Sequence, residues 1–320
     1  MPRVLITGSA GNLGSRLARA MLREPCALRL MYHRTPLPQD VATASDVEPI
    51  RADLADPATL GAAVRGVDTI VHFAGVLFAP RPERFLPTTN TQWFANLVTV
   101  ALAARVTRIV LISFPHVEGP TTPDRPATGR LDGHPVSVHA QTRLEEERLL
   151  FARTAETATT PVSLRIGMVY GPGILMIDAA RWLAQRRLLG VWRRPTWIHL
   201  IATEDFLRAT IAAALRPAVN GIYHLGDEAP TTLQEFLDAA CDRWGTARPW
   251  RLPGALIRCA AALCEMGAWL FRCRAPLTRD FITIGQVSYC GDTSRFRRDL
   301  VPVLTHRTYH AGLRAQWPAE

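Results

Sequence analysis

"LITGSAGNLGSRL" (residues 5–17) is the stretch that decides the fold. An apolar run at 3–8 leads directly into Gly8, Gly11 and Gly14, and an amphipathic helical pattern follows. Gly8 permits a tight turn, Gly11 lets the backbone approach a pyrophosphate, and Gly14 allows a helix to pack closely on a strand. The N-terminus of that helix adds free N–H groups and the positive end of the helix dipole. The stretch therefore predicts a dinucleotide-binding strand–turn–helix unit, with a purely structural glycine turn as the alternative.

Short apolar runs alternate with helical patterns over the first half of the chain. The runs have strand length and are rich in β-branched residues or Leu; they are 3–8, 27–33, 68–75, 108–113 and 161–167. Helical segments such as "PATLGAAVRG" lie between them. This order predicts βαβ units, and hence an α/β fold: a Rossmann-type, doubly wound parallel sheet with helices on both faces.

Beyond residue 170 the regular alternation weakens, because Pro, Gly and Arg become frequent and the strand-like runs become short. We expect a dinucleotide-binding domain at 1–168 and a smaller C-terminal lobe at 169–320. The segment 198–215 is predicted to pack back onto the first domain. A small-molecule substrate would bind in the cleft between the two parts.

Composition narrows the class of protein. The chain has 320 residues, of which 48% are hydrophobic and 20% are charged, as in soluble globular proteins. Its net charge is +9, but no run of five basic residues and no basic–aromatic cluster occurs, which argues against nucleic-acid binding. All 37 basic residues are Arg, so Schiff-base chemistry and lysine proton relays are excluded.

Location and metal binding are inferred from the N-terminus and the cysteines. "MPRVLITG" runs straight into a strand, which predicts no signal peptide and a cytoplasmic protein. The six cysteines form no CxxC pair and have no accompanying histidine spacing, so we expect mostly buried, reduced thiols and no metal site; they are residues 26, 241, 259, 264, 273 and 290.

The segment 252–271 is apolar apart from Arg258 and Glu265. Two charges in the middle of the run argue against a transmembrane span. We expect an amphipathic helix packed on the C-terminal lobe, with contact to a membrane surface as the alternative.

The end of the second predicted strand bears on the choice of nucleotide. It reads Tyr32-His33-Arg34, with no acidic residue to hold a ribose 2′-hydroxyl, whereas an arginine suits a 2′-phosphate. The sequence therefore favours NADP(H), with NAD(H) as the alternative. Asp53, in "RADLAD", is expected to hold the adenine end, to cap the helix that begins near "PATL", or to do both.

Several motifs occur together in one order along nearly the whole chain. They are "TGSAGNLG", "RADLAD", "VHFAG", Asn90 and Asn96, "RIVLIS", "SLRIGMVYGPG" and "TEDFLRATIAAAL". In this order they resemble the extended short-chain dehydrogenase/reductases, the NAD-dependent epimerase/dehydratase group. The C-terminal "PLTRDFITIG…YCGDTSRFRRDL" resembles the branch with 3β-hydroxysteroid dehydrogenases and dihydroflavonol reductases. The resemblance implies an NAD(P)-dependent oxidoreductase or epimerase, in which a homodimer is a common assembly.

The resemblance also assigns positions. Cofactor-binding residues would be Thr7, Gly8, Gly11, Asn12, Leu13, Gly14, Arg34, Asp53, Leu54, Ala74, Gly75 and Tyr170. The family's catalytic Tyr and Lys, four positions apart, align with His139 and Arg143 in "HAQTRLEEERLL", and its active-site Ser aligns with Ser113. Both the Tyr and the Lys are therefore replaced here.

His139 could exchange a proton with substrate, because an unperturbed imidazole titrates near pH ~6.5. Arg143 could support a ribose or an oxyanion and stays charged. A cation one turn away would depress the histidine pKa and favour a neutral base. His116 is a second candidate base, His199 is expected to be structural, and Arg143 could instead pair with Glu147.

We expect an enzyme that acts on a medium-sized, fairly apolar alcohol or ketone. A redox-silent NADP(H)-binding sensor or scaffold is the first alternative, because the usual Tyr and Lys are both absent from their positions. A non-redox isomerase or lyase that uses the same pocket is the second.

Overall fold

A seven-stranded parallel sheet forms the centre of the protein. The computed structural model describes residues 1–75, 80–271, 275 and 277–318. The strands, in spatial order, are β11 (Gly221–Leu225), β6 (Thr160–Ile166), β5 (Arg108–Ser113), β4 (Thr69–His72), β1 (Arg3–Thr7), β2 (Ala27–Tyr32) and β3 (Val47–Arg51). All neighbouring pairs in this sheet are parallel, which confirms the predicted Rossmann-type fold.

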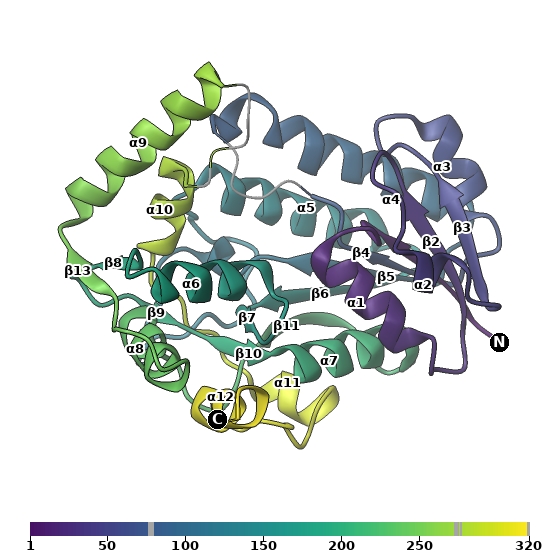
Figure 1. Ribbon diagram of the computed structural model, residues 1–320. Coiled ribbons are helices and arrows are strands. Elements are labelled where there is room, and N and C mark those ends of the chain that lie inside the picture. The colour runs from purple at the N-terminus through teal and green to yellow at the C-terminus, as the bar shows by residue number, and fades with distance from the viewer. Residues whose placement is uncertain (76–79, 272–274, 276, 319–320) are drawn as a thin grey trace.

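Helices cover both faces of the sheet (Figure 1). They include α1 (Asn12–Met21), α2 (Gln39–Ala42), α3 (Pro57–Val64), α4 (Trp93–Ala103), α5 (Val138–Thr154) and α7 (Thr203–Leu215). Short helical turns η1 (Pro82–Arg84), η2 (Pro87–Gln92) and η3 (Pro115–Glu118) join some of these elements.

The hydrophobic core has two layers because successive strand residues point to opposite faces. Val4 and Ile6 of β1 pack in the layer that contains Leu17 of α1 and Phe206 of α7. Leu5, between them, packs in the layer formed with α3 and α4. Strands buried on both faces explain why the predicted strand runs are continuously apolar.

The remaining elements lie mainly at the end of the molecule opposite β3 (Figure 1). The strands there are β7 (Met168–Tyr170), β8 (Gly190–Trp192), β9 (Trp197–Ile198), β10 (Leu200–Ala202), β12 (Thr231–Thr232) and β13 (Trp250–Leu252). They form three two-stranded sheets, β7–β10, β8–β13 and β9–β12. The helices are α6 (Leu175–Gln185), α8 (Leu233–Arg243), α9 (Gly254–Leu270), α10 (Arg279–Gly285), α11 (Ser294–Asp299) and α12 (Tyr309–Gln316).

Two elements from the second half of the chain lie on the central sheet. Strand β11 pairs with β6. At the end of α7, the carbonyl of Ala214 accepts a hydrogen bond from Thr69 Oγ1 of β4 at 3.2 Å. The boundary between 168 and 169 therefore divides the sequence at the start of β7, but it does not divide the sheet, and the two-domain description remains a proposal.

The segment 252–271 contributes one helix, α9, whose Ile257, Ala261 and Ala268 are buried. No helix in the described part of the chain is both long and apolar enough to cross a bilayer. Cysteines 26, 241 and 290 are buried thiols, whereas Cys259 is exposed and Cys273 lies outside the described residues. No cluster of potential metal ligands occurs among the described residues.

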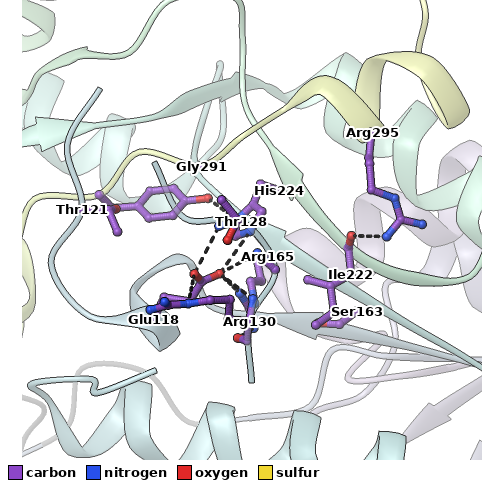
Figure 2. Close-up of polar contacts among 12 residues, drawn as sticks. Glu118, Thr121, Thr128, Arg130, Ser163, Arg165, Ile222, His224, Gly291 and Arg295 are labelled. Atoms are coloured by element: carbon purple, nitrogen blue, oxygen red, sulfur yellow. Dashed lines mark hydrogen bonds and ion pairs between the residues drawn. The ribbon is translucent and has the colours of Figure 1, made fainter. Parts of the chain in front are cut away.

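A buried ion-pair network joins Arg165 of β6 to Glu118 of η3 (Figure 2), and Glu147 connects the same arginine to α5. The Arg165 guanidinium on β6 is fully buried between Glu147 of α5, at 2.6 Å, and Glu118 of η3. Glu147 also accepts a hydrogen bond from Ser163 Oγ at 2.7 Å. Glu118 further accepts backbone N–H groups of Thr128, Gly129 and Arg130.

The network keeps Arg165 and Glu118 charged. Burial alone would lower the pKa of the Arg165 guanidinium, but Glu147 and Glu118 raise it. Burial would raise the pKa of Glu118, but contacts with His224, backbone amides and Arg165 lower it to about 2. Three buried ionic groups that satisfy one another hold the helix that carries His139 against β6.

Removing one carboxylate from this network should destabilise the fold strongly. Glu147→Ala is expected to lower the free energy of unfolding by about 3–5 kcal/mol, because it leaves a buried guanidinium without one of its two carboxylate partners. The control is Asp242→Ala, which removes the exposed Arg248–Asp242 pair and should cost no more than about 1 kcal/mol. Denaturant unfolding of the three proteins measures both values; equal losses would contradict the role of the network.

Candidate active site

The glycine turn forms a close backbone packing between β1 and α1. Gly8 has a φ of +68°, and a Cβ there would come within 2.9 Å of the Ala74 backbone nitrogen. A Cβ on Gly14 would come within 2.3 Å of the Gly8 carbonyl oxygen. The Gly11 N–H donates to that same oxygen at 2.9 Å. A side chain at Gly14 would therefore push the helix away from the end of the strand, and one at Gly8 would clash with the backbone that follows β4.

The N-terminus of α1 is suited to an anion. Gly11 is the N-cap, no described side chain caps the helix, and its first turn contains no acidic residue. The first-turn amides and the positive end of the helix dipole are therefore free to receive a pyrophosphate. The residues present fit the phosphates of a dinucleotide at this turn.

The other residues predicted around the turn have structural contacts. Thr7 is buried, and its Oγ1 lies 2.8 Å from His72 Nδ1 and accepts the Ala74 N–H at 3.4 Å. The Asn12 side chain donates to the Gly173 carbonyl at 2.9 Å. Leu13 is partly buried against the core. Thr7 and Asn12 thus connect the turn to β4 and to the loop that follows β7.

The sites predicted for the adenosine end lie near the carboxyl ends of β2 and β3. Arg34 is exposed, directly after the β2 end. His33 Nε2 lies 3.4 Å from Asp53 Oδ2, and Asp53 Oδ1 accepts the Ala55 N–H at 2.9 Å. Leu54 is buried, and its carbonyl accepts a hydrogen bond from Asn96 at 3.0 Å.

The alternative that Asp53 caps the next helix is wrong. The N-cap of α3 is Asp56, whose Oδ1 accepts the Ala58 N–H at 3.0 Å. Asp53 lies one turn earlier, where it closes a local turn instead.

Tyr170 is fully buried at the end of β7. A Cβ on Gly312 of α12 would come within 2.1 Å of its hydroxyl oxygen, and the Phe236 ring lies 6.0 Å from its ring. The Tyr170 carbonyl accepts a hydrogen bond from Thr203 Oγ1 at 3.0 Å. Its side chain packs in the core, so a contribution to cofactor binding would come from the backbone of the loop that it anchors.

His139 lies at the start of α5, where Ser137 is the N-cap and accepts the Ala140 N–H at 3.2 Å. The imidazole is only 2% exposed, and its Nδ1 has no hydrogen-bond partner among the described residues. The Phe114 ring meets it edge to face with centroids 4.6 Å apart. Burial, Arg143 and His116 together lower the pKa of His139 to about 3, so the ring is neutral at physiological pH.

Arg143 lies one turn after His139 and is 5% exposed. Its guanidinium lies over Gly75: a Cβ there would be 2.0 Å from the Arg143 terminal nitrogen. The expected alternative pairing with Glu147 is wrong, because Arg143 donates to Glu146 at 2.7 Å and Glu147 binds Arg165. A fixed cation therefore stands beside the carboxyl end of β4.

Glu146 is the main residue that the sequence interpretation missed. It is completely buried, and its second carboxylate oxygen has no partner among the described residues. Burial raises the pKa of Glu146 to about 7, although the adjacent Arg143 opposes this shift. The signal was present in the sequence, since residues three apart on a helix are neighbours.

Ser113 and His116 bring further unpaired polar atoms into the same region. Ser113 Oγ and His116 Nδ1 are buried without a described partner, while His116 Nε2 lies 3.0 Å from the Val287 carbonyl. Burial lowers the pKa of His116 to about 4. Phe114, between them in sequence, contacts His116 as well as His139, with centroids 4.9 Å apart. His199, expected to be structural, is buried beside the Asp227 carbonyl.

The Asn90 side chain supports the start of α5 from another element. Asn90 Nδ2 donates to Thr142 Oγ1 at 3.1 Å, and Thr142 Oγ1 donates to the His139 carbonyl at 3.0 Å. The Asn90 side-chain oxygen has no described partner. Several buried polar atoms of this region thus lack hydrogen-bond partners. Such groups of unpaired atoms are uncommon in stable cores and are typical of sites that bind a ligand.

The sheet, the glycine turn and the cluster of buried, unpaired polar atoms define a dinucleotide-binding protein of the Rossmann type. The model of the NAD dependent epimerase/dehydratase family matches residues 4–226. The chain belongs to this family.

Two curated relatives span most of the chain. One is the 4-hydroxy-2-methyl-3-oxo-4-farnesyl-3,4-dihydroquinoline-1-oxide ketoreductase of Stigmatella aurantiaca, 25% identical over 99% of this chain and 97% of that protein. The other is the 2-alkyl-3-oxoalkanoate reductase of Stenotrophomonas maltophilia (strain K279a), 27% identical over 87% of each chain. Among solved structures, MoeE5 in complex with UDP-glucose and NAD has a TM-score of 0.75 at 20% identity, covering 98% of this chain and 97% of that one.

The buried neutral His139 should be visible in the pH dependence of stability. Its folded pKa of about 3 lies below the unfolded value of about 6.5, so the unfolded state binds the extra proton between these values. Stability then falls as pH falls through this range. From pH ~6 to pH ~4, the wild type should lose about 1.4 kcal/mol more per pH unit than His139→Gln, in which this group is absent.

Denaturant unfolding at a series of pH values measures this difference, and contributions common to both proteins cancel. Parallel stability curves would show that the imidazole is not buried in its neutral form.

Proposed function

We propose that the protein is an NAD(P)-dependent oxidoreductase that interconverts a medium-sized, fairly apolar alcohol and its ketone, with His139 and Arg143 in place of the family's Tyr and Lys. The observation that carries the proposal is the pairing of these residues on one buried side of α5. His139 presents an unpaired ring nitrogen, and Arg143 is held over Gly75 beside the dinucleotide turn.

The substrate class rests on the relatives. The names of the two reductases include a farnesyl and an alkyl substituent, and both names state reduction of an oxo compound. The side chains around His139 include Phe114, which offers an apolar surface to such a substituent.

When bound, the dinucleotide supplies or accepts the hydride. The first turn of α1 would hold its pyrophosphate, and Arg143 would hold the ribose nearest the reacting ring or an oxyanion. His139, neutral at rest, would take the alcohol proton on a ring nitrogen during oxidation. In the reductive direction the imidazolium would return that proton to the carbonyl oxygen.

The low pKa of His139 gives the two directions different pH profiles. The base form is fully populated from pH ~5 to pH ~8, so kcat/KM for alcohol oxidation should not change through titration of His139. The imidazolium becomes tenfold rarer with each pH unit, so kcat/KM for ketone reduction should fall about tenfold per unit. His139→Gln should lower both rates by about 10²–10⁴-fold.

Initial rates with a series of alkyl ketones and alcohols, followed by absorbance of the reduced nicotinamide, test this proposal. Dinucleotide affinity of His139→Gln should stay within about twofold of the wild type. Undiminished turnover of His139→Gln would remove His139 from the reaction. The control variant is Arg153→Gln, which changes an exposed residue on the same helix α5 and should leave turnover unchanged.

We also propose that NADP(H) is preferred over NAD(H). Arg34 supports this preference, because it is exposed at the end of β2, and its side chain has no hydrogen bond or ion pair to other described residues. Its guanidinium can pair with a 2′-phosphate in the forked geometry typical of such contacts.

Arg34→Ala should weaken NADPH binding about 10–100-fold, as expected for loss of a hydrogen-bonded charge pair, and leave NADH binding unchanged. Calorimetric titration with both reduced dinucleotides measures this effect. Equal losses for the two ligands, or none for NADPH, would contradict a 2′-phosphate contact.

A redox-silent dinucleotide-binding protein is the second candidate function. It is favoured by the depth at which His139 is buried, since a 2% exposed imidazole exchanges protons with a substrate only where that substrate reaches it. Tight dinucleotide binding together with no oxidation or reduction of any alcohol or ketone tested would select this alternative.

A further inference from the structure

We propose that the outer surface of α9 and the arginine-rich segment at its base form a docking surface for an anionic lipid bilayer. This surface is distinct from the active site, and its binding to lipid does not require the proposed oxidoreductase activity.

Helix α9 lies at the outer edge of the molecule, with β13 and β8 at its base and α6 nearby (Figure 1). One side of the helix is buried through Ile257, Ala261 and Ala268. The other side carries large apolar side chains that are 54–79% exposed, which we call the α9 face: Leu256, Leu263, Met266, Trp269, Leu270 and Phe271.

The α9 face has helical spacing. Leu256, Leu263, Met266 and Leu270 follow one another at seven, three and four residues, so they form one continuous stripe. Trp269 is 79% exposed near the C-terminal end of that stripe. Scattered exposed apolar residues are ordinary, but a stripe along four turns of one helix marks an interaction surface.

The segment 181–194, "RWLAQRRLLGVWRR", supplies the charge. It contains five arginines and no acidic residue; they are Arg181, Arg186, Arg187, Arg193 and Arg194. All five are exposed. Within the described part of the chain, none of them forms an ion pair.

Three acidic residues near α9 and its base are already paired with other arginines. Asp238 pairs with Arg251 at 2.6 Å, Asp242 pairs with Arg248 at 2.7 Å, and Glu265 of α9 pairs with Arg279 at 2.8 Å. The five arginines of segment 181–194 therefore give the base of α9 a net positive charge.

Hydrogen bonds fix the arginine-rich segment to the start of α9. Strand β8 pairs with β13, which ends two residues before α9 begins. Trp250 Nε1 donates to the Arg187 carbonyl at 2.9 Å, and the Arg193 N–H donates to the Leu252 carbonyl at 3.1 Å. Trp250 and Leu188, both 63% exposed, extend the apolar side chains into this segment.

The combination of an apolar stripe with uncompensated cations matches the chemistry of an anionic bilayer. Apolar side chains of such helices enter the boundary between headgroups and acyl chains, tryptophan is favoured at that depth, and arginines bind the anionic headgroups. A second copy of this chain is a poorer occupant, because a twofold contact across the same surface would bring the two sets of five arginines together.

Co-sedimentation of the purified full chain with lipid vesicles tests the proposal. The probe vesicles contain about 30% phosphatidylglycerol in phosphatidylcholine, and the comparison vesicles are pure phosphatidylcholine. We expect binding to the anionic vesicles that falls steeply between about 0.1 M and about 1 M salt, and much weaker binding to the neutral ones.

Two triple variants separate the apolar and the charged contributions. Leu263→Ser/Met266→Ser/Trp269→Ser should lower the partition onto anionic vesicles at least about tenfold. Arg181→Gln/Arg187→Gln/Arg194→Gln should lower it by about 10²-fold, from about 1 kcal/mol per arginine. Val303→Ser, an exposed apolar residue elsewhere, and Arg153→Gln are the matched controls and should bind as the wild type does.

Thermal unfolding confirms that each variant is folded, and the substituted side chains are exposed, so the melting temperature should change little. The proposal is overturned if the wild type does not bind anionic vesicles, if neutral vesicles bind equally well, or if either triple variant binds like the wild type. It is also overturned if light scattering shows a dimer that the α9 variant abolishes, since the stripe would then be covered by a second copy.

Discussion

The contact between Gly14 and the carbonyl of Gly8 is the constraint on which the rest of the site depends. It brings the N-terminus of α1 directly above the end of β1, where the amides of the first turn meet an anion. From that position Asn12 and Arg16 reach the carbonyls of Gly173 and Pro172 at 2.9 and 3.1 Å. The same turn therefore positions both the dinucleotide site and the loop that leads into α6.

A second close approach connects this turn to α5. Gly8 leaves no space between its backbone and Ala74, and the next residue, Gly75, leaves room only for the guanidinium of Arg143. Glycines at 8, 14 and 75 thus fix three backbones and one cation relative to one another. A side chain at any of these positions would separate elements that must act together.

The absence of lysine changes how charge is held in the core. An arginine head group is larger and needs more acceptors than an ammonium, and Glu146 provides one within the same helix. The next residue, Glu147, faces Arg165. Two adjacent buried acidic residues thereby each contact a separate arginine, so α5 carries two arginine–carboxyl contacts behind His139.

The sheet and the glycine turn could be predicted because they depend on local signals. Each strand run is apolar throughout, and the glycines stand where the turn needs them, so neither requires knowledge of distant residues. The strand predicted at 68–75 is shorter in the structure, where β4 spans Thr69–His72. Periodicity identifies a strand but does not show where its pairing stops.

The pairing of charged residues could not be predicted in the same way. Both Glu146 and Glu147 are within reach of Arg143 along a helix, and only the position of Arg165 on β6 decides that Glu147 turns to the sheet. Glu118 is 47 residues from Arg165 in sequence. Asp53 and Asp56 likewise both precede α3, and the backbone geometry at Asp56 selects the cap. Such choices depend on tertiary partners that compete for one side chain.

In the proposed mechanism the two replacements in the catalytic pair are coupled through acid–base chemistry. A phenol accepts a proton only as the phenolate, which is populated near neutral pH when a nearby cation lowers the pKa, whereas a neutral imidazole accepts a proton without such help. Once a histidine occupies position 139, a cation at 143 is no longer needed to activate the base; burial keeps the imidazole unprotonated at rest, and the field of Arg143 adds to this effect. The remaining role of Arg143 in this mechanism is to hold an oxygen-rich group beside Gly75. Its forked guanidinium is anchored by Glu146 and can therefore act as a fixed hydrogen-bond donor.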